Sequence, residues 1–169
     1  MGILSGNPRE NPMHYGEVVA VWGGYLGAKS ALVTYQGYLN HAGDRDLAKF
    51  IEDMIRHVLE SEIEETESLL KANSVEIPPT PPERSKANSE DIPTGARAKD
   101  PEIAAALSKD IAQSLVAASQ AIGQCVREDI AMMFGQFHTK RAQMGSKLLQ
   151  MNKDKGWLIH PPLHVDQVK

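Results

Sequence analysis

Histidine and carboxylate side chains are the groups in this sequence that could hold a metal ion, so their spacing is considered first. Helical bundles that bind two iron ions turn a Glu from each of two helices and a Glu-x-x-His pair from each of the other two toward the interior. The residues three positions before His14, His41, His57 and His138 are Asn11, Tyr38, Met54 and Gly135. The Glu-x-x-His pair is therefore absent. His14 with Glu17, and Asp53 with His57, have helical spacing, but such pairs are common on solvent-exposed helix faces.

An acidic run, ESEIEETE at residues 60–67, is the second candidate site. It places five carboxylates in the C-terminal half of a predicted helix, where the helix dipole mildly disfavours negative charge. We interpret the run as a solvent-exposed face that lysines of a neighbouring helix neutralise. The alternative is that Glu62 or Glu65 lies in the interior as a metal ligand.

Four other side chains are candidates for chemistry, and for each a structural role is the better interpretation. Asp110 and Arg141 could meet between the last two helices as a structural ion pair. His138 lies beside two phenylalanines, which is typical of a hydrogen-bonded histidine at the edge of a core. Cys125 has no base nearby in the sequence, so its thiol is predicted to be unreactive. No G-x-S-x-G, P-loop or dinucleotide motif is present, and we predict no catalytic residue, no cofactor and no bound metal.

Composition excludes several classes of protein. A chain of 169 residues with 41% hydrophobic residues is long enough to fold as one soluble domain. One cysteine cannot form an intramolecular disulfide, and a net charge of −4 gives no basic surface for nucleic acid. No apolar run is long enough to span a membrane. The start, Met1 and Gly2, is like a myristoylation signal, but Gly6 stands where Ser or Thr is required.

The first expected helix begins near Pro12, with Asn11 as its cap, and runs to about His41. Its apolar residues recur at spacings of three and four: Val18, Val21, Trp22, Tyr25, Leu26, Leu32, Val33, Tyr35 and Leu39. Gly23, Gly24 and Gly27 interrupt this pattern, each at a cost of about 1 kcal/mol relative to alanine. We expect them to allow close packing of a neighbouring helix. The alternative is a groove that admits a ligand.

A tight turn and a second helix should follow. Gly43 is predicted to take the left-handed position after the first helix, and Asp44 to cap the next one. The second helix is expected from about 45 to 73, with one apolar stripe along Leu47, Ile51, Met54, Val58, Glu65 and Leu69.

Residues 74–99 contain five prolines and few apolar side chains, so they should not form a helix. A helix of nearly thirty residues is roughly 40 Å long, and an extended proline-rich chain covers about 3.1 Å per residue. The segment can therefore cross the whole bundle. Parallel second and third helices require such a crossover, as in ferritin-like bundles.

The third expected helix starts at Asp100, Pro101 and Glu102, and it turns near residues 123–127 into a fourth that Gly156 ends. The chain 1–169 thus forms one all-α four-helix bundle of two hairpins, 12–73 and 100–156, with crossover 74–99 and tail 157–169. The hairpins repeat weakly at an offset of 83. The matching positions are Leu32 and Val33 with Leu115 and Val116, Asp46 with Asp129, and Pro78 and Pro79 with Pro161 and Pro162.

Three segments resemble a known family: MGILSGNPRENPMHYGEV, IPPTPPERSKANSEDIPTGAR and REDIAMMFGQFHTKRAQMGSKLLQMNKDKGWLIHPPLH. Together they resemble ferritin-like proteins of spore-forming bacteria whose members are described as spore coat proteins, similar to coat protein F. The resemblance covers nearly the full chain and implies a ferritin-like bundle and a role in the spore. It transfers no catalytic residue, because none of this family's positions is assigned such a role.

Two functional hypotheses follow. In the first, the protein is a non-enzymatic structural or interaction component, made in the cytoplasm and incorporated into the spore coat. Its partners would be other coat proteins and a second copy, with a homodimer formed through the glycine-bearing first helix and the methionines of the fourth: Met132, Met133, Met144 and Met151. In the second, it is a ferritin-like metal-binding protein with a degenerate carboxylate and histidine site.

Stability is expected to come from the hairpins and not from a metal. Truncation of Leu115 to alanine should then cost about 2–5 kcal/mol. Changes at His57 or Glu65 should stay within about 0.5 kcal/mol if both face solvent.

Overall fold

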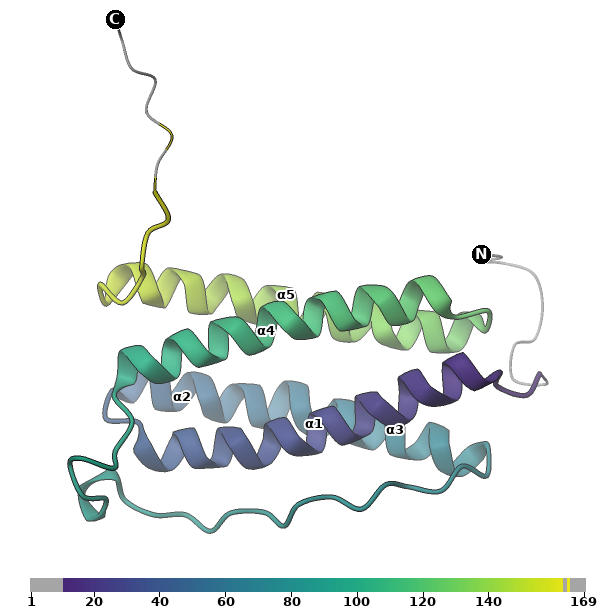
Figure 1. The fold of residues 1–169 in the computed structure, drawn as a ribbon, viewed down its shortest axis with the longest axis horizontal. Helices are drawn as coiled ribbons and strands as arrows, with labels where there is room; N and C mark the ends of the chain where they lie inside the picture. Colours follow the sequence, from purple (N-terminus) through teal and green to yellow (C-terminus); the bar gives the residue numbers. More distant parts are fainter. Residues whose placement is uncertain (1–10, 163, 165–169) are drawn as a thin grey trace, which may run out of the picture.

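The computed structural model describes residues 11–162 and residue 164. Its elements are α1 (Tyr15–His41), α2 (Arg45–Met54), the π-helical turn η2 (Ile55–Leu59), α3 (Glu60–Ala72), the 3-10 turn η3 (Ser89–Asp91), α4 (Asp100–Gln124) and α5 (Glu128–Asp154). These residues contain no strand, and the long helices lie side by side (Figure 1). The prediction of an all-α helical bundle is confirmed. None of the helices described is both long and apolar enough to cross a membrane. The predictions on residues 1–6 and on the end of the tail lie outside the described residues.

The first helix begins at Tyr15 and not near Pro12, and its cap is His14 and not Asn11. The Nδ1 atom of His14 accepts a hydrogen bond from the backbone N–H of Gly16 at 3.0 Å. In return, the carboxylate of Glu17 accepts from the backbone N–H of His14 at 3.1 Å. This reciprocal pair satisfies two of the amides that a helix start leaves without partners. The His14 and Glu17 pair therefore belongs to a helix cap.

The turn between α1 and α2 follows the prediction at Asp44 but not at Gly43. Asp44 caps α2, since its carboxylate accepts from the backbone N–H groups of Asp46 and Leu47 at 2.9 and 3.1 Å. Gly43 does not have a positive φ; among the described glycines only Gly156 does. The backbone N–H of Gly43 instead donates to Asp100 at 2.8 Å, which connects this turn to the start of α4.

A π-helical turn interrupts the second long helix, which the sequence predicts as regular from 45 to 73. At its end the backbone N–H of Glu60 donates to the carbonyl of Ile55, five residues back. This turn inserts one extra residue into the helix and rotates everything that follows. The predicted stripe is therefore wrong at Glu65, which is half-exposed, whereas Leu69 is partly buried against the core. The residues buried after the turn are Leu59, Glu62, Ile63, Thr66 and Leu70.

The proline-rich segment between α3 and α4 lies beside α1 (Figure 1). Side chains of α1 hold its backbone: Gln36 accepts from the N–H of Arg84 at 2.8 Å, and Asn40 donates to the carbonyl of Ser85 at 2.9 Å. Near its end, the N–H of Ala98 donates to Nδ1 of His41 at 3.0 Å. The assignment of this path to a ferritin-like topology stays a prediction.

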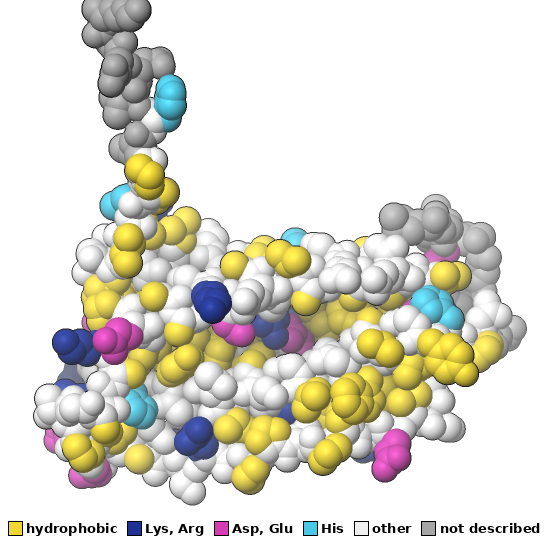
Figure 2. All heavy atoms as spheres, viewed as in Figure 1, with side chains coloured by type: hydrophobic (Ala, Val, Ile, Leu, Met, Phe, Trp, Pro, Cys, Tyr) yellow, Lys and Arg dark blue, Asp and Glu magenta, His cyan; other side chains and the backbone are white. Residues whose placement is uncertain are grey.

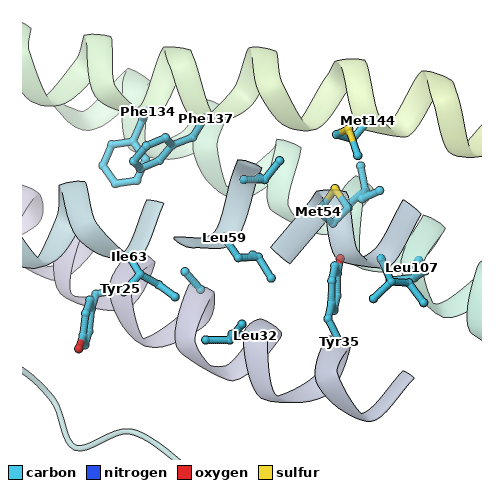
Figure 3. Packing of buried hydrophobic residues seen from close by; sticks show 14 of the residues in the cluster. Tyr25, Leu32, Tyr35, Met54, Leu59, Ile63, Leu107, Phe134, Phe137 and Met144 are labelled. Carbon is cyan, nitrogen blue, oxygen red and sulfur yellow. The ribbon is translucent and has the colours of Figure 1, made fainter. Parts of the chain in front are cut away.

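The core is one cluster of aliphatic, methionine and aromatic side chains drawn from every long helix (Figure 3). Phe134 and Phe137 meet edge to face, with ring centroids 5.9 Å apart. Leu107 is fully buried, but Leu115 is only partly buried at the edge of the cluster. The choice of Leu115 as a central core residue is therefore wrong.

The weak repeat matches the boundaries of the helices. The helix ends His41 and Gln124 are 83 residues apart, and so are the helix starts Arg45 and Glu128. Both hairpin turns thus occupy equivalent positions, as a duplicated helical pair requires.

Candidate functional site

A groove of about 710 Å³ lies between α1 and α4. Small residues of the two helices form its walls, and α3 and α5 form its floor through Glu62, Phe134, Phe137 and Arg141. Figure 2 shows the hollow on the front face, with apolar side chains along it and charged ones near the middle of the molecule. Ligand sites usually measure about 300–1,000 Å³ and combine apolar walls with a few polar groups.

The glycines of α1 keep this groove open. A Cβ atom at Gly23 or Gly27 would have no other atom within 4 Å. The prediction that these two glycines allow close helix packing is therefore wrong, and the alternative, a groove, is what they line. Gly24 fits the close-packing interpretation better, because its Cβ would lie 3.5 Å from the ring of Phe134.

A buried ion pair forms part of the groove floor. Nε and Nη2 of Arg141 donate to the two carboxylate oxygens of Glu62 at 2.8 and 2.6 Å. Glu62 is 4% exposed and Arg141 7% exposed, so both charges have lost most of their hydration. Burial alone would lower the pKa of Arg141, but the hydrogen bonds to Glu62 and its charge raise this pKa overall. Arg141 therefore stays charged at neutral pH.

This pair corrects two predictions. Arg141 takes Glu62 as its partner and not Asp110. Glu62 is not part of a solvent-exposed acidic face, whereas Glu65 is half-exposed and lies 3.8 Å from Nζ of Lys140, as the interpretation with neighbouring lysines expects.

Asp110 lies at the same end of the groove and is bound by a tyrosine. The hydroxyl of Tyr35 donates to Oδ2 of Asp110 at 2.6 Å. Burial, and next the negative charge of Asp110, raise the pKa of Tyr35 far above its ordinary value. Tyr35 is therefore a neutral donor at any physiological pH.

A second buried carboxylate, Glu17, joins the two hairpins at one end of the bundle. One of its oxygens accepts from the backbone N–H groups of Val126 and Arg127, at 2.8 and 2.7 Å, where α5 begins. Glu17 is 1% exposed. It is a structural anchor that the sequence did not indicate, because its partners lie 109 and 110 residues away.

Arg127 extends this anchor to two more segments. Its guanidinium donates to the carbonyl of Asn11 at 3.2 Å, to the side chain of Asn73 at 2.9 Å, and to both oxygens of Asp129. The hydrogen bond from Arg127 lowers the pKa of Asp129 and keeps this carboxylate ionised. All these polar groups already have partners within the chain.

The remaining candidates do not gather at the groove. His57 is exposed, and Asp53 and His138 are half-buried. Cys125 is buried, and burial, followed by the charge of Glu17, raises its pKa to about 11, so the thiol stays protonated. Within residues 11–162 and residue 164, no three His, Cys, Asp or Glu side chains are grouped so that they could hold a metal ion.

Comparisons with known proteins cover nearly the whole chain. Residues 1–169 match the family described as "Protein of unknown function (DUF3231)". "Uncharacterized protein YvdQ" of Bacillus subtilis (strain 168) is 48% identical over 167 residues, which is 99% of this chain and 98% of that protein. A crystal structure of a "putative spore coat protein" from Bacillus halodurans C-125 is 48% identical. It superposes with a TM-score of 0.91 over 95% of this chain and 100% of that one.

Proposed function

The chain belongs to the DUF3231 family, and from this membership we propose that it is a non-enzymatic structural or interaction component of the spore coat. The observation that carries the proposal is the likeness to the Bacillus halodurans protein that bears a spore coat description, at 48% identity and a TM-score of 0.91. Such identity over the full length of both chains supports a common role.

We propose, further, that the bundle is ferritin-like in topology. The equal spacing of the two hairpin turns supports a duplicated helical pair. The extended segment beside α1 supports a long crossover between the pairs. In such bundles metal ligands project inward from the helices. Here the inward-facing carboxylate Glu62 is bound through both oxygens by Arg141, whose positive charge stands where a metal cation would be needed.

Assembly with coat proteins or with a second copy would use apolar side chains on the outside of the bundle. Val126, Met132 and Leu149 are such residues, with Met132 60% exposed. The methionine-rich surface expected of the fourth helix is smaller than predicted, because Met133 and Met144 are buried in the core. The homodimer therefore stays a proposal that rests on other exposed side chains.

Location in the spore tests the proposed role. A tagged copy produced in sporulating Bacillus subtilis that lacks its YvdQ relative should fractionate with the coat and resist extraction by mild salt. A tagged copy that stays in the mother-cell lysate throughout sporulation, beside a coat protein that fractionates normally, would contradict the proposal.

Metal dependence separates the structural role from the metal-binding alternative. Since Arg141 neutralises Glu62 and His57 is exposed, we expect purified protein to hold far less than one iron or manganese per chain. A chelator should leave the melting temperature of the wild type, His57→Ala and Glu65→Ala unchanged, because a bound metal would add stability that a chelator removes. Near-stoichiometric metal, with a chelator effect that disappears in either variant, would favour the alternative.

A further inference from the structure

The groove between α1 and α4 has the shape of a slender ligand site. The part of α4 that lines it runs from Asp110 to Gln124, which is about 21 Å at 1.5 Å per residue. Its volume of 710 Å³ over that length gives a mean cross-section of about 34 Å². A groove of this length and volume admits an extended chain.

Polarity changes from one end of the groove to the other. The charged lining residues, Glu62, Asp110 and Arg141, lie together at the inner end. Helices α1 and α4 are antiparallel, and the groove between them runs from these charged residues to an outer end beside Tyr15 and Gln124. Between the two ends the lining is mainly apolar: Ala28, Gly24, Gly23, Ala117, Ala118, Ala121, Phe134 and Phe137. A ligand with one polar head and one long apolar body matches this arrangement.

The charge at the inner end selects the sign of the head. Arg141 is matched by Glu62 through two hydrogen bonds, so this pair adds no net charge. Asp110 receives one hydrogen bond, from the neutral hydroxyl of Tyr35. Its second oxygen makes no hydrogen bond to the part of the chain that the structure describes. This oxygen of Asp110 is therefore left to accept from a ligand, and an ammonium group that donates to it would form a charge-assisted hydrogen bond.

Aromatic rings in the middle of the groove suit the apolar body of the ligand. Phe134 and Phe137 line the floor, near Gly24, and their rings meet at an interplanar angle of 82°. A hydrocarbon chain packs well against such rings. A carboxylate head at the inner end would be repelled by Asp110.

We propose that this groove binds a single-chain amphiphilic amine, with its ammonium group at Asp110 and its hydrocarbon chain directed toward Tyr15. The proposal adds a small-molecule site to the structural role and does not depend on that role. It assigns Asp110 to recognition of the head and Gly23 and Gly27 to the opening that admits the chain.

Calorimetry with three ligands of equal chain length tests the choice of head group. Decylammonium, decanol and decanoate are titrated into the wild type below their aggregation concentrations. We expect one molecule of decylammonium to bind per chain, about tenfold more tightly than decanol, because a hydrogen bond between two charged groups is stronger than one from a neutral hydroxyl. Decanoate should bind more weakly than decanol.

Two variants with matched controls test the residues. Asp110→Asn keeps an acceptor for Tyr35 but removes the charge, so it should abolish the preference for decylammonium over decanol. Gly23→Leu projects a side chain into open space and should abolish binding of all three ligands. The controls are Asp53→Asn, outside the groove lining, and Gly135→Leu, on α5 where a Cβ also meets no atom within 4 Å. Both controls should bind like the wild type, and melting curves confirm that each variant is folded.

Three results would overturn the proposal. The first is equal affinity of the wild type for the amine and the alcohol, and the second is unchanged binding by Gly23→Leu. The third is the absence of amine binding together with a dimer mass in light scattering that Gly23→Leu reduces to a monomer mass. In that case a second copy covers the groove.

Discussion

Replacing Arg141 by leucine should lower the free energy of unfolding by about 3–5 kcal/mol, because it leaves the carboxylate of Glu62 buried without a partner. At 4% exposure the carboxylate has little access to water, so hydration replaces the two lost hydrogen bonds only in part. Denaturant unfolding followed by circular dichroism measures the loss from the shift of the midpoint.

A double variant separates the loss of stability caused by the unpaired charge from the loss caused by altered packing. Glu62→Leu combined with Arg141→Leu removes both charges and fills the space with apolar atoms, so it should recover most of the loss. Lys140→Leu is the matched control on α5, since Lys140 and its neighbour Glu65 are 38% and 37% exposed. An exposed pair contributes about 0–1 kcal/mol. An Arg141→Leu variant no less stable than Lys140→Leu would show that the buried pair does not stabilise the fold.

Truncating Leu107 to alanine should destabilise the protein by about 2–5 kcal/mol through lost burial and the cavity left behind. Leu107 has no exposed surface and faces the common core from α4. Thermal unfolding monitored by circular dichroism gives the change in melting temperature.

Leu115→Ala is the comparison on the same helix. Because Leu115 is only partly buried, its truncation removes less surface from an apolar environment and should cost clearly less than that of Leu107. Equal losses in the two variants would mean that Leu115 lies in the core, as the sequence pattern alone suggested.

The predictions that depended on residues close together in the sequence agree best with the structure. The helices extend close to the predicted limits, and the cap at Asp44 and the turn after Gln124 are present, because a cap or a period of 3.6 residues is set within a few positions of the chain. His14 shows where a helix start inferred from residue types alone is wrong. Asn11 and Pro12 form a plausible helix start by type, but a capping box at His14 and the long-range bonds of Glu17 hold the start at Tyr15.

The sequence indicated several residues of the candidate site but not how they pair. Asp110, Arg141, Glu62 and the glycines were all singled out, but their partners were assigned wrongly. The π-helical turn explains the position of Glu65, because its extra residue rotates this side chain out of the buried stripe and toward the surface. Glu62 follows the buried Val58 by four residues and faces inward. A regular helical pattern carries no signal for such a turn.

The amino-acid sequence by itself determined an all-α chain with four long helical segments and two equivalent turns, since apolar periodicity, caps and prolines act over short distances. Only the tertiary structure decided which charges meet. Glu62 and Arg141 are 79 residues apart, and Glu17 and Arg127 are 110 apart. Their pairing depends on how whole helices rotate and pack. The groove also depends on this packing, because Gly23 and Gly27 line open space only in the hollow that α1 and α4 leave above Phe134 and Phe137.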